Sequence, residues 1–124
     1  MKIPYNSGFI YNKNNFDYLC VSSNDINGID SIEIWDLLNK NLFKVFKMID
    51  SIITCIIRWN NRYILICDIR DKCLKVFDLK NEKVISKIKE GEKYIGCVKK
   101  FYHPIYGESL LTADENDKIK LWTI

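Results

Sequence analysis

Short runs of β-branched, aliphatic and aromatic residues alternate with polar residues along nearly the whole chain of 124 residues. A period of two is typical of strands with one buried face, and no segment keeps a helical period beyond one or two turns. Turns rich in Asn, Gly and Lys separate the runs. The pattern predicts eleven strands, at about 8–12, 17–22, 31–37, 42–47, 52–59, 63–68, 73–79, 83–89, 95–102, 109–113 and 118–123. It allows a twelfth at 1–5, which Pro4 would confine to a sheet edge.

The chain contains three similar segments. Ser31-Ile-Glu-Ile-Trp-Asp-Leu37, Cys73-Leu-Lys-Val-Phe-Asp-Leu79 and Lys118-Ile-Lys-Leu-Trp-Thr-Ile124 each carry an aromatic residue near the end. These anchor residues, Trp35, Phe77 and Trp122, are 42 and 45 residues apart. The offset also aligns Asn39 with Asn81 and Cys55 with Cys97. The spacing predicts a single domain, 1–124, of three repeats at about 1–37, 38–79 and 80–124, whereas an unrelated β-sandwich would not explain the matches.

Four short strands in about 42 residues match the strand number and the repeat length of a propeller blade. The sequence resembles the WD-repeat (tryptophan–aspartate repeat) family: Trp35-Asp36 has the full signature, Phe77-Asp78 is a conservative variant, and Trp122 keeps the Trp alone. Asp71 matches the family's Asp six residues before the aromatic. The resemblance implies an all-β fold, a partial β-propeller of about three four-stranded antiparallel blades. Trp35, Asp36, Asp71, Phe77, Asp78 and Trp122 would be its structural anchors.

The family's third-strand aromatic packs between blades, and its indole N–H needs a partner. The Gly-His pair that the family often carries is absent here, so Thr112 is the expected partner of Trp122. Lysines that alternate with apolar residues are expected on solvated strand faces, where they would discourage edge pairing: Lys75, Lys87, Lys99 and Lys120.

The resemblance also implies a non-catalytic scaffold that presents loops to a protein or peptide. Turns that follow the second strand of each repeat gather on one rim. The first of these turns carries Ile26 and Ile29 among polar residues, which makes it a contact candidate. The predicted partner-binding residues are Asp25, Ile26, Ile29, Arg70, Lys72, Glu115 and Asp117.

Catalysis has little support, and we expect neither enzyme activity, a cofactor nor a metal. His103, the chain's one histidine, lies beside Pro104 in a turn. Carboxylates such as Asp114 and Asp117 fall in another turn. Cys67 and Cys73 could approach across a hairpin, but a zinc site would need two further ligands. The alternative is a fragment or regulatory segment of a propeller-containing enzyme whose active centre is absent here.

Net charge, cysteine spacing and the length of apolar runs indicate which partners the chain binds and where in the cell it lies. The net charge of +3 is too mild to require nucleic acid, although arginines and aromatics do mix, at Arg58, Arg62, Arg70, Trp59, Tyr63 and Tyr102. Five cysteines without a Cys-x-x-Cys pair favour reduced thiols in the cytoplasm or nucleus. No apolar run is long enough to span a membrane.

Three blades would leave two apolar faces uncovered, because each propeller blade packs against two neighbours. We therefore expect a fragment, a truncated gene product, or half of a two-chain ring of six blades. Self-association or missing blades would complete such a ring.

Overall fold

Eleven strands and no helix make up the residues that the computed structural model describes, which are 5–24, 27–89, 95–114 and 118–123. All eleven predicted strands are confirmed. The predicted strand at 1–5 lies almost wholly outside the described residues. The strands are β1 (Tyr5–Lys13), β2 (Phe16–Asn24), β3 (Asp30–Asp36), β4 (Asn41–Lys47), β5 (Ile53–Arg58), β6 (Tyr63–Asp68), β7 (Cys73–Asp78), β8 (Lys83–Lys89), β9 (Ile95–His103), β10 (Gly107–Asp114) and β11 (Ile119–Thr123).

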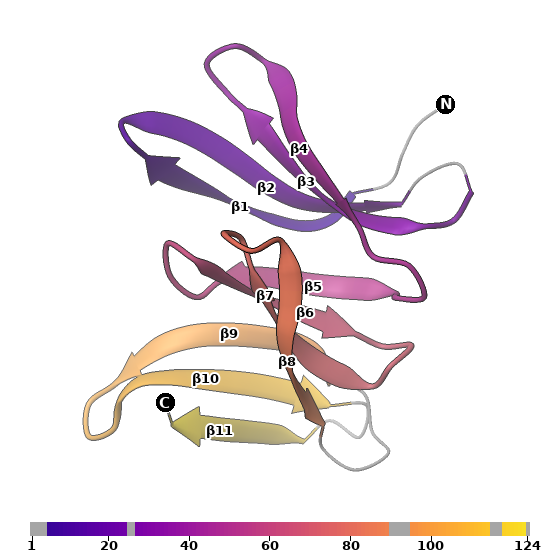
Figure 1. Cartoon of the computed structure of the whole chain (residues 1–124). Coiled ribbons are helices and arrows are strands. Elements are labelled where there is room, and N and C mark those ends of the chain that lie inside the picture. Colours follow the sequence, from indigo (N-terminus) through magenta and orange to yellow (C-terminus); the bar gives the residue numbers. More distant parts are fainter. Residues whose placement is uncertain (1–4, 25–26, 90–94, 115–117, 124) are drawn as a thin grey trace.

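Each strand pairs antiparallel with its neighbours in sequence, so the chain forms three separate up-and-down sheets (Figure 1). The first sheet holds β1 to β4, the second β5 to β8, and the third β9 to β11. The third sheet has three strands among the described residues, one fewer than the blade pattern predicts, and β11 lies at its edge. The connections are hairpins, which place alternate turns on two opposite rims.

The three sheets meet through their first strands. β5 contacts both β1 and β9, so the inner strands lie side by side while the outer strands diverge. Each inner strand has the same irregularity one residue after its start: the ladder skips position 6 in β1, 54 in β5 and 96 in β9. Next to these bulges, the Ser7 hydroxyl donates to the Ile56 carbonyl at 3.3 Å, and the Thr54 hydroxyl donates to the Gly96 carbonyl at 3.1 Å.

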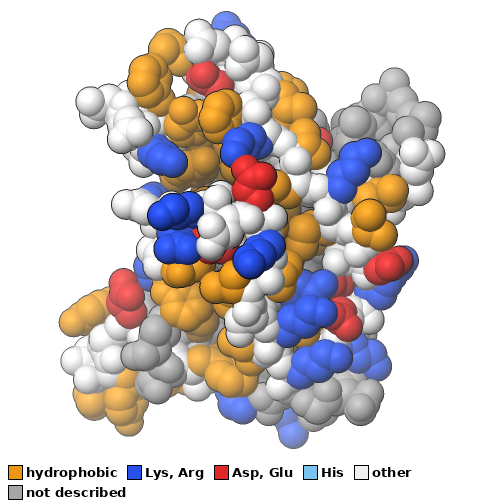
Figure 2. All heavy atoms as spheres, in the orientation of Figure 1, with side chains coloured by type: hydrophobic (Ala, Val, Ile, Leu, Met, Phe, Trp, Pro, Cys, Tyr) orange, Lys and Arg blue, Asp and Glu red, His pale blue; other side chains and the backbone are white. Residues whose placement is uncertain are grey.

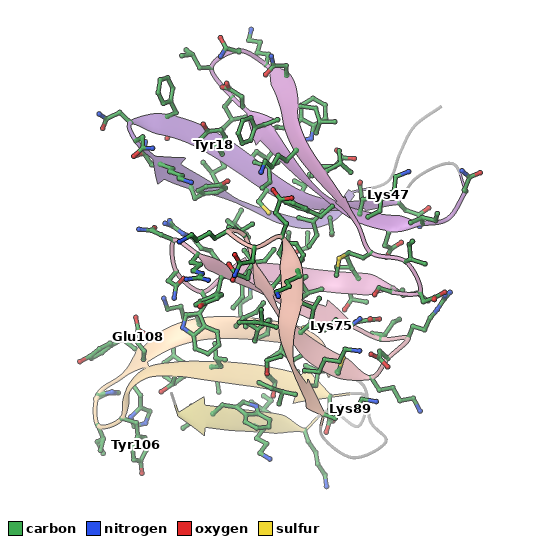
Figure 3. All side chains as sticks on the ribbon, viewed as in Figure 1. Tyr18, Lys47, Lys75, Lys89, Tyr106 and Glu108 are labelled. Atoms are coloured by element: carbon green, nitrogen blue, oxygen red, sulfur yellow. The ribbon has the colours of Figure 1, made fainter. Side chains whose placement is uncertain are left out.

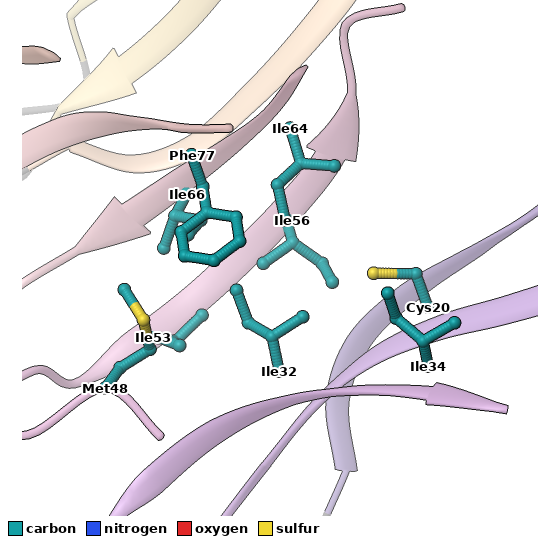
Figure 4. Packing of buried hydrophobic residues seen from close by; sticks show 9 residues of the cluster. All are labelled: Cys20, Ile32, Ile34, Met48, Ile53, Ile56, Ile64, Ile66 and Phe77. Carbon is teal, nitrogen blue, oxygen red and sulfur yellow. The ribbon is translucent and has the colours of Figure 1, made fainter. Parts of the chain in front are cut away.

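Two apolar layers fill the spaces between the sheets. Between the first and second sheets, Cys20, Ile32 and Ile34 face Ile56, Ile64 and other residues of the second sheet (Figure 4). Between the second and third, the layer contains Leu65, Leu74, Ile95, Val98 and Leu110. Because the second sheet is covered on both faces, every residue of β7 is buried.

The three anchor residues occupy the same register. Trp35 pairs with Leu19, Phe77 with Ile64 and Trp122 with Leu110, each from a third strand to a second strand. In both four-stranded sheets the ladder to the outer strand has a bulge beside the anchor. It skips position 43 between the partners of Ile34 and Trp35, and position 85 between the partners of Val76 and Phe77. The anchors therefore have equivalent backbone positions, as the repeat spacing predicts.

The three anchors differ in burial, because each packs on the preceding sheet and the first anchor has none among the described residues. Phe77 is 3% exposed and meets Phe46 of the first sheet, with ring centroids 5.0 Å apart. Trp122 packs against the layer between the second and third sheets, and its indole donates to the Thr112 hydroxyl at 2.9 Å, which confirms the predicted partner. Trp35 is only half-buried, and its indole donates to Glu33. In the described chain, no sheet covers the face that Trp35 occupies.

The aspartate that follows each of the first two anchors closes the next turn. One Asp36 carboxylate oxygen accepts the N–H groups of Leu38 and Asn39, and the other accepts the Asn39 amide. Asp78 accepts the same three kinds of bond from Lys80 and Asn81. The matched pair Asn39 and Asn81 is thus explained by one repeated turn.

The prediction for Lys75 is wrong, because this side chain, which extends from β7 of the second sheet (Figure 3), is buried. Its ammonium lies 2.7 Å from a carboxylate oxygen of Asp68, which is fully buried, and 3.1 Å from the Ser51 hydroxyl. Lys75 is two residues before Phe77 in one strand, so both side chains lie on the face of the second sheet that turns toward the first sheet. Lys87, Lys99 and Lys120 are exposed, as predicted.

Asp68 also organises the turn that follows it. Its other oxygen accepts the backbone N–H groups of Ile52 and Arg70 at 3.0 Å. Burial by itself would raise the pKa of Asp68, but the hydrogen bonds from Lys75 and the backbone outweigh it and hold the pKa below its usual value.

We predict that Lys75→Met lowers the free energy of unfolding by about 3–5 kcal/mol at neutral pH, because it leaves the Asp68 carboxylate buried without a cation. Since the folded-state pKa of Asp68 is lowered, its contribution is present above about pH 4 and is lost as pH falls through the folded value. Urea denaturation should therefore show a smaller difference from wild type at about pH 3.

Lys99→Met, at an exposed position, is the matched control and should change stability by less than about 0.5 kcal/mol. Equal losses for Lys75→Met at both pH values would contradict this role for the ion pair.

Candidate binding groove

A groove of about 590 Å³ opens at the end of the seam between the first and second sheets. It lies on the rim formed by the β1–β2, β5–β6 and β7–β8 turns, on the left in Figure 1. Lys and Arg side chains gather beside hydrophobic ones in this region (Figure 2). The lining residues are aromatic, aliphatic, amide-bearing or basic: Tyr11, Lys13, Asn14, Tyr18, Ile34, Phe43, Lys44, Phe46, Asn61, Arg62, Leu79 and Lys80. None of them is a carboxylate.

The β1–β2 hairpin positions the aromatic wall of the groove. Asn14 and Asn15 both have positive φ, 54° and 68°, which is the backbone of a two-residue type I′ turn. That turn sets the register in which Tyr11 lies directly opposite Tyr18. The two rings stack with centroids 5.5 Å apart, and Tyr18 meets Phe43 of β4 at the same distance. Three strands of the first sheet thereby supply one continuous aromatic file.

Tyr11 stays protonated over a wide pH range. Burial of the phenol, together with the neighbouring Cys20 and Tyr18, raises the pKa of Tyr11 to about 12, although Arg58 opposes this shift. The Arg58 guanidinium, which comes from the second sheet, lies 5.6 Å from the Tyr11 ring centroid. This contact joins the two walls of the seam.

Two ion pairs hold the second wall of the groove. Arg62 donates to both oxygens of the buried Asp78 at 3.0 and 2.8 Å. The hydrogen bonds from Arg62 hold the pKa of Asp78 well below its usual range. Lys44 of β4 pairs with Glu82 in the turn after β7, which ties the first sheet to the second.

These pairs leave two groove cations without a counter-charge. None of the carboxylates that the structure describes lies within ion-pairing distance of Lys13 or Lys80, and both side chains are exposed. Lys13 ends β1 in the first sheet and Lys80 follows β7 in the second, so the two come from opposite walls. A smaller cavity of about 270 Å³ adjoins the groove beside Tyr11 and Arg58. The arrangement suits an anionic ligand with an apolar part.

The residues predicted to bind a partner lie elsewhere. Ile29, Arg70 and Lys72 belong to the β2–β3 and β6–β7 turns, on the rim opposite the groove. Ile29 is half-buried, and Lys72 has a positive φ of 52° within its turn. Arg70 is exposed, and its guanidinium lies 3.9 Å from a carboxylate oxygen of Asp50. Asp25, Ile26, Glu115 and Asp117 fall outside the described residues. Asp71, a predicted anchor, lies in the β6–β7 turn, and its carboxylate pairs with the Lys87 ammonium at 3.0 Å.

The side chains considered for catalysis or metal binding lie in turns and strands whose fold they support. The His103 Nδ1 accepts the N–H groups of Ile105 and Tyr106, so this side chain closes the β9–β10 turn. Cys67 lies opposite Cys55 rather than Cys73 in the strand register. Four of the five cysteines are buried, Cys97 is exposed, and all are unpaired. Over the described ranges, no three His, Cys, Asp or Glu side chains come together as metal ligands would.

The arginines and aromatics considered for nucleic acid are divided between the two rims. Arg58 covers Tyr11 and Arg62 covers Tyr63, whereas Arg70 lies at the opposite end of the second sheet.

The part of the chain that the structure describes contains no helix long and apolar enough to cross a membrane.

Comparison with known proteins finds likeness to solved structures but to no family model. No family model matches the sequence, and no curated protein matches it. The chain is similar to a solved structure described as KlHsv2 with loop 6CD replaced by a Gly-Ser linker, with a TM-score of 0.61 and 16% sequence identity. The match covers 98% of this chain and 36% of that one. This likeness concerns the fold alone, and the all-β sheets are consistent with a β-propeller-like fold.

The groove residues were not among the predicted binding residues, although one local sequence pattern points to part of the groove. The Asn14-Asn15 turn between two aromatic-rich runs predicts that Tyr11 and Tyr18 face one another. The contact of Tyr18 with Phe43 and the approach of Lys80 depend on how the sheets pack, which no local pattern contains.

Proposed function

We propose that this chain is a WD-repeat-like part-propeller of about three blades, and that it acts as a non-catalytic scaffold holding a segment of a protein partner in the groove. Two ordered sheets form the walls, and one ion pair and one cation–π contact join them, so the groove is largely pre-formed. The cysteines and the globular composition suit the cytoplasm or nucleus.

The observation that carries this proposal is the exposed apolar surface at the mouth of the groove. Phe43 is 57% exposed although it sits in an aromatic file with Tyr18 and Tyr11. An exposed aromatic that is held rigidly by its neighbours is typical of binding surfaces. The lining offers no nucleophile paired with a base, and this favours binding over chemistry.

A displayed library of random peptides tests the scaffold function. We expect selection on the whole chain to enrich peptides whose binding is lost with Phe43→Ala plus Lys80→Ala, because this variant removes the apolar wall and one cation. The matched control is Tyr106→Ala plus Lys99→Ala on the third sheet, where Tyr106 is also 57% exposed. Enriched peptides that bind both variants and wild type equally would contradict the proposed site.

We further propose that the chain associates with itself or with further blades to cover its outer sheets. Among the described strands, β11 forms an open edge on which Ile119 is 74% and Leu121 38% exposed. At the other end, the half-buried Trp35 occupies an uncovered face. An exposed strand edge with apolar side chains is a template for pairing.

Sedimentation velocity at micromolar concentration tests this association. We expect a dimer that dissociates on dilution, and Ile119→Lys should weaken it because the charge would be placed at the new contact. A stable monomer at all concentrations would contradict self-association.

A further inference from the structure

We infer that the groove recognises an acidic peptide segment that inserts an aromatic or large aliphatic side chain between flanking carboxylates. This inference rests on the proposed function and adds the chemistry of the partner. Phe43, Tyr18 and Leu79 would receive the apolar side chain, and Lys13 and Lys80 would pair with the carboxylates.

The charge of the groove is complementary to an acidic ligand. The lining holds the cations Lys13, Lys44, Arg62 and Lys80 and no carboxylate. Lys44 and Arg62 are already paired with Glu82 and Asp78 across or along the seam. The remaining two lysines come from opposite walls, so a bound chain would meet one cation at each side. Exposed lysines attract a carboxylate from solution without the cost of burying it.

The apolar wall of the groove is complementary to an apolar side chain. The Tyr11, Tyr18 and Phe43 rings form a file with successive centroids 5.5 Å apart, and Phe43 remains more than half exposed at its end. Such a rigid aromatic surface loses little entropy when it binds another apolar side chain, and it supplies an anchor pocket of the kind that dominates interface energies.

The nature of the polar groups favours a peptide over a small metabolite. A small-molecule site usually has a few polar groups that converge on the ligand from fixed positions. Here the uncompensated polar groups are long, flexible lysine side chains spread along an open seam. They match carboxylates spaced along an extended chain. A nucleic acid would need a longer basic track than two uncompensated lysines provide.

Fluorescence anisotropy with four labelled pentapeptides on the intact chain tests the inference. The peptides are Asp-Asp-Phe-Asp-Asp, Asn-Asn-Phe-Asn-Asn, Asp-Asp-Gly-Asp-Asp and Lys-Lys-Phe-Lys-Lys, each with blocked ends. We expect the first to bind at least about tenfold more tightly than any other, because only it satisfies both lysines and the aromatic wall. Its affinity should fall as sodium chloride is raised from about 0.05 M to about 0.5 M.

Charge-reversal variants locate the binding. Lys13→Glu plus Lys80→Glu should weaken the acidic aromatic peptide by about tenfold or more, whereas Lys99→Glu plus Lys118→Glu, with the same change in net charge, should leave it within about twofold. Circular dichroism melting of each variant separates loss of binding from loss of fold.

The outcomes separate the inference from the proposed function. Equal binding of the acidic and asparagine peptides, or preference for the basic peptide, overturns the inference, and so does failure of the acidic aromatic peptide to bind. Groove-dependent peptides from the random library would still support the scaffold in each case. Binding of a labelled oligothymidine that depends on Lys13 and Lys80 would overturn the inference in favour of nucleic acid.

Discussion

The structure depends on one constraint: each sheet has two apolar faces and can cover them only with other sheets. In β7 of the second sheet both faces are covered, since Phe77 faces the first sheet while Leu74 and Val76 face the third. The first and third sheets each have one covered face. The stability of the chain is therefore concentrated at the two internal seams, and the half-buried Trp35 lies on a face that no described sheet covers.

The same constraint generates the groove. The sheets meet through their inner strands and diverge toward the outer ones, so a seam that is tightly packed at Ile56 and Ile64 opens at the rim. There Arg58 of β5 covers Tyr11 at one end of the aromatic file, whereas Phe43 at the other end remains exposed. The Lys44–Glu82 pair bridges the opening between the walls. The groove and the core are thus two ends of one interface.

Much of the fold could be predicted from the sequence because strand period and turn chemistry are local. The alternation of apolar and polar side chains predicts the eleven strands, and the repeat spacing predicts equivalent backbone positions for the three anchors. The need of the Trp122 indole for an acceptor predicts its hydrogen bond to Thr112. The charge of Lys75 predicts a solvated side chain, but its position two residues before Phe77 puts it on the same buried face. The buried Asp68 that compensates it lies on a neighbouring strand, and pairing across strands decides such a case. The groove depends on packing between sheets, so composition and spacing could not locate it.

The most direct test of the account compares Phe77→Ala with Trp35→Ala by chemical denaturation, at a concentration where the chain is monomeric. The two residues have the same register, but only Phe77 has a preceding sheet to pack on. The account predicts that Phe77→Ala costs about 3–5 kcal/mol of unfolding free energy and Trp35→Ala at most about half as much. Equal costs would contradict the claim that packing of each anchor on the preceding sheet holds the structure together.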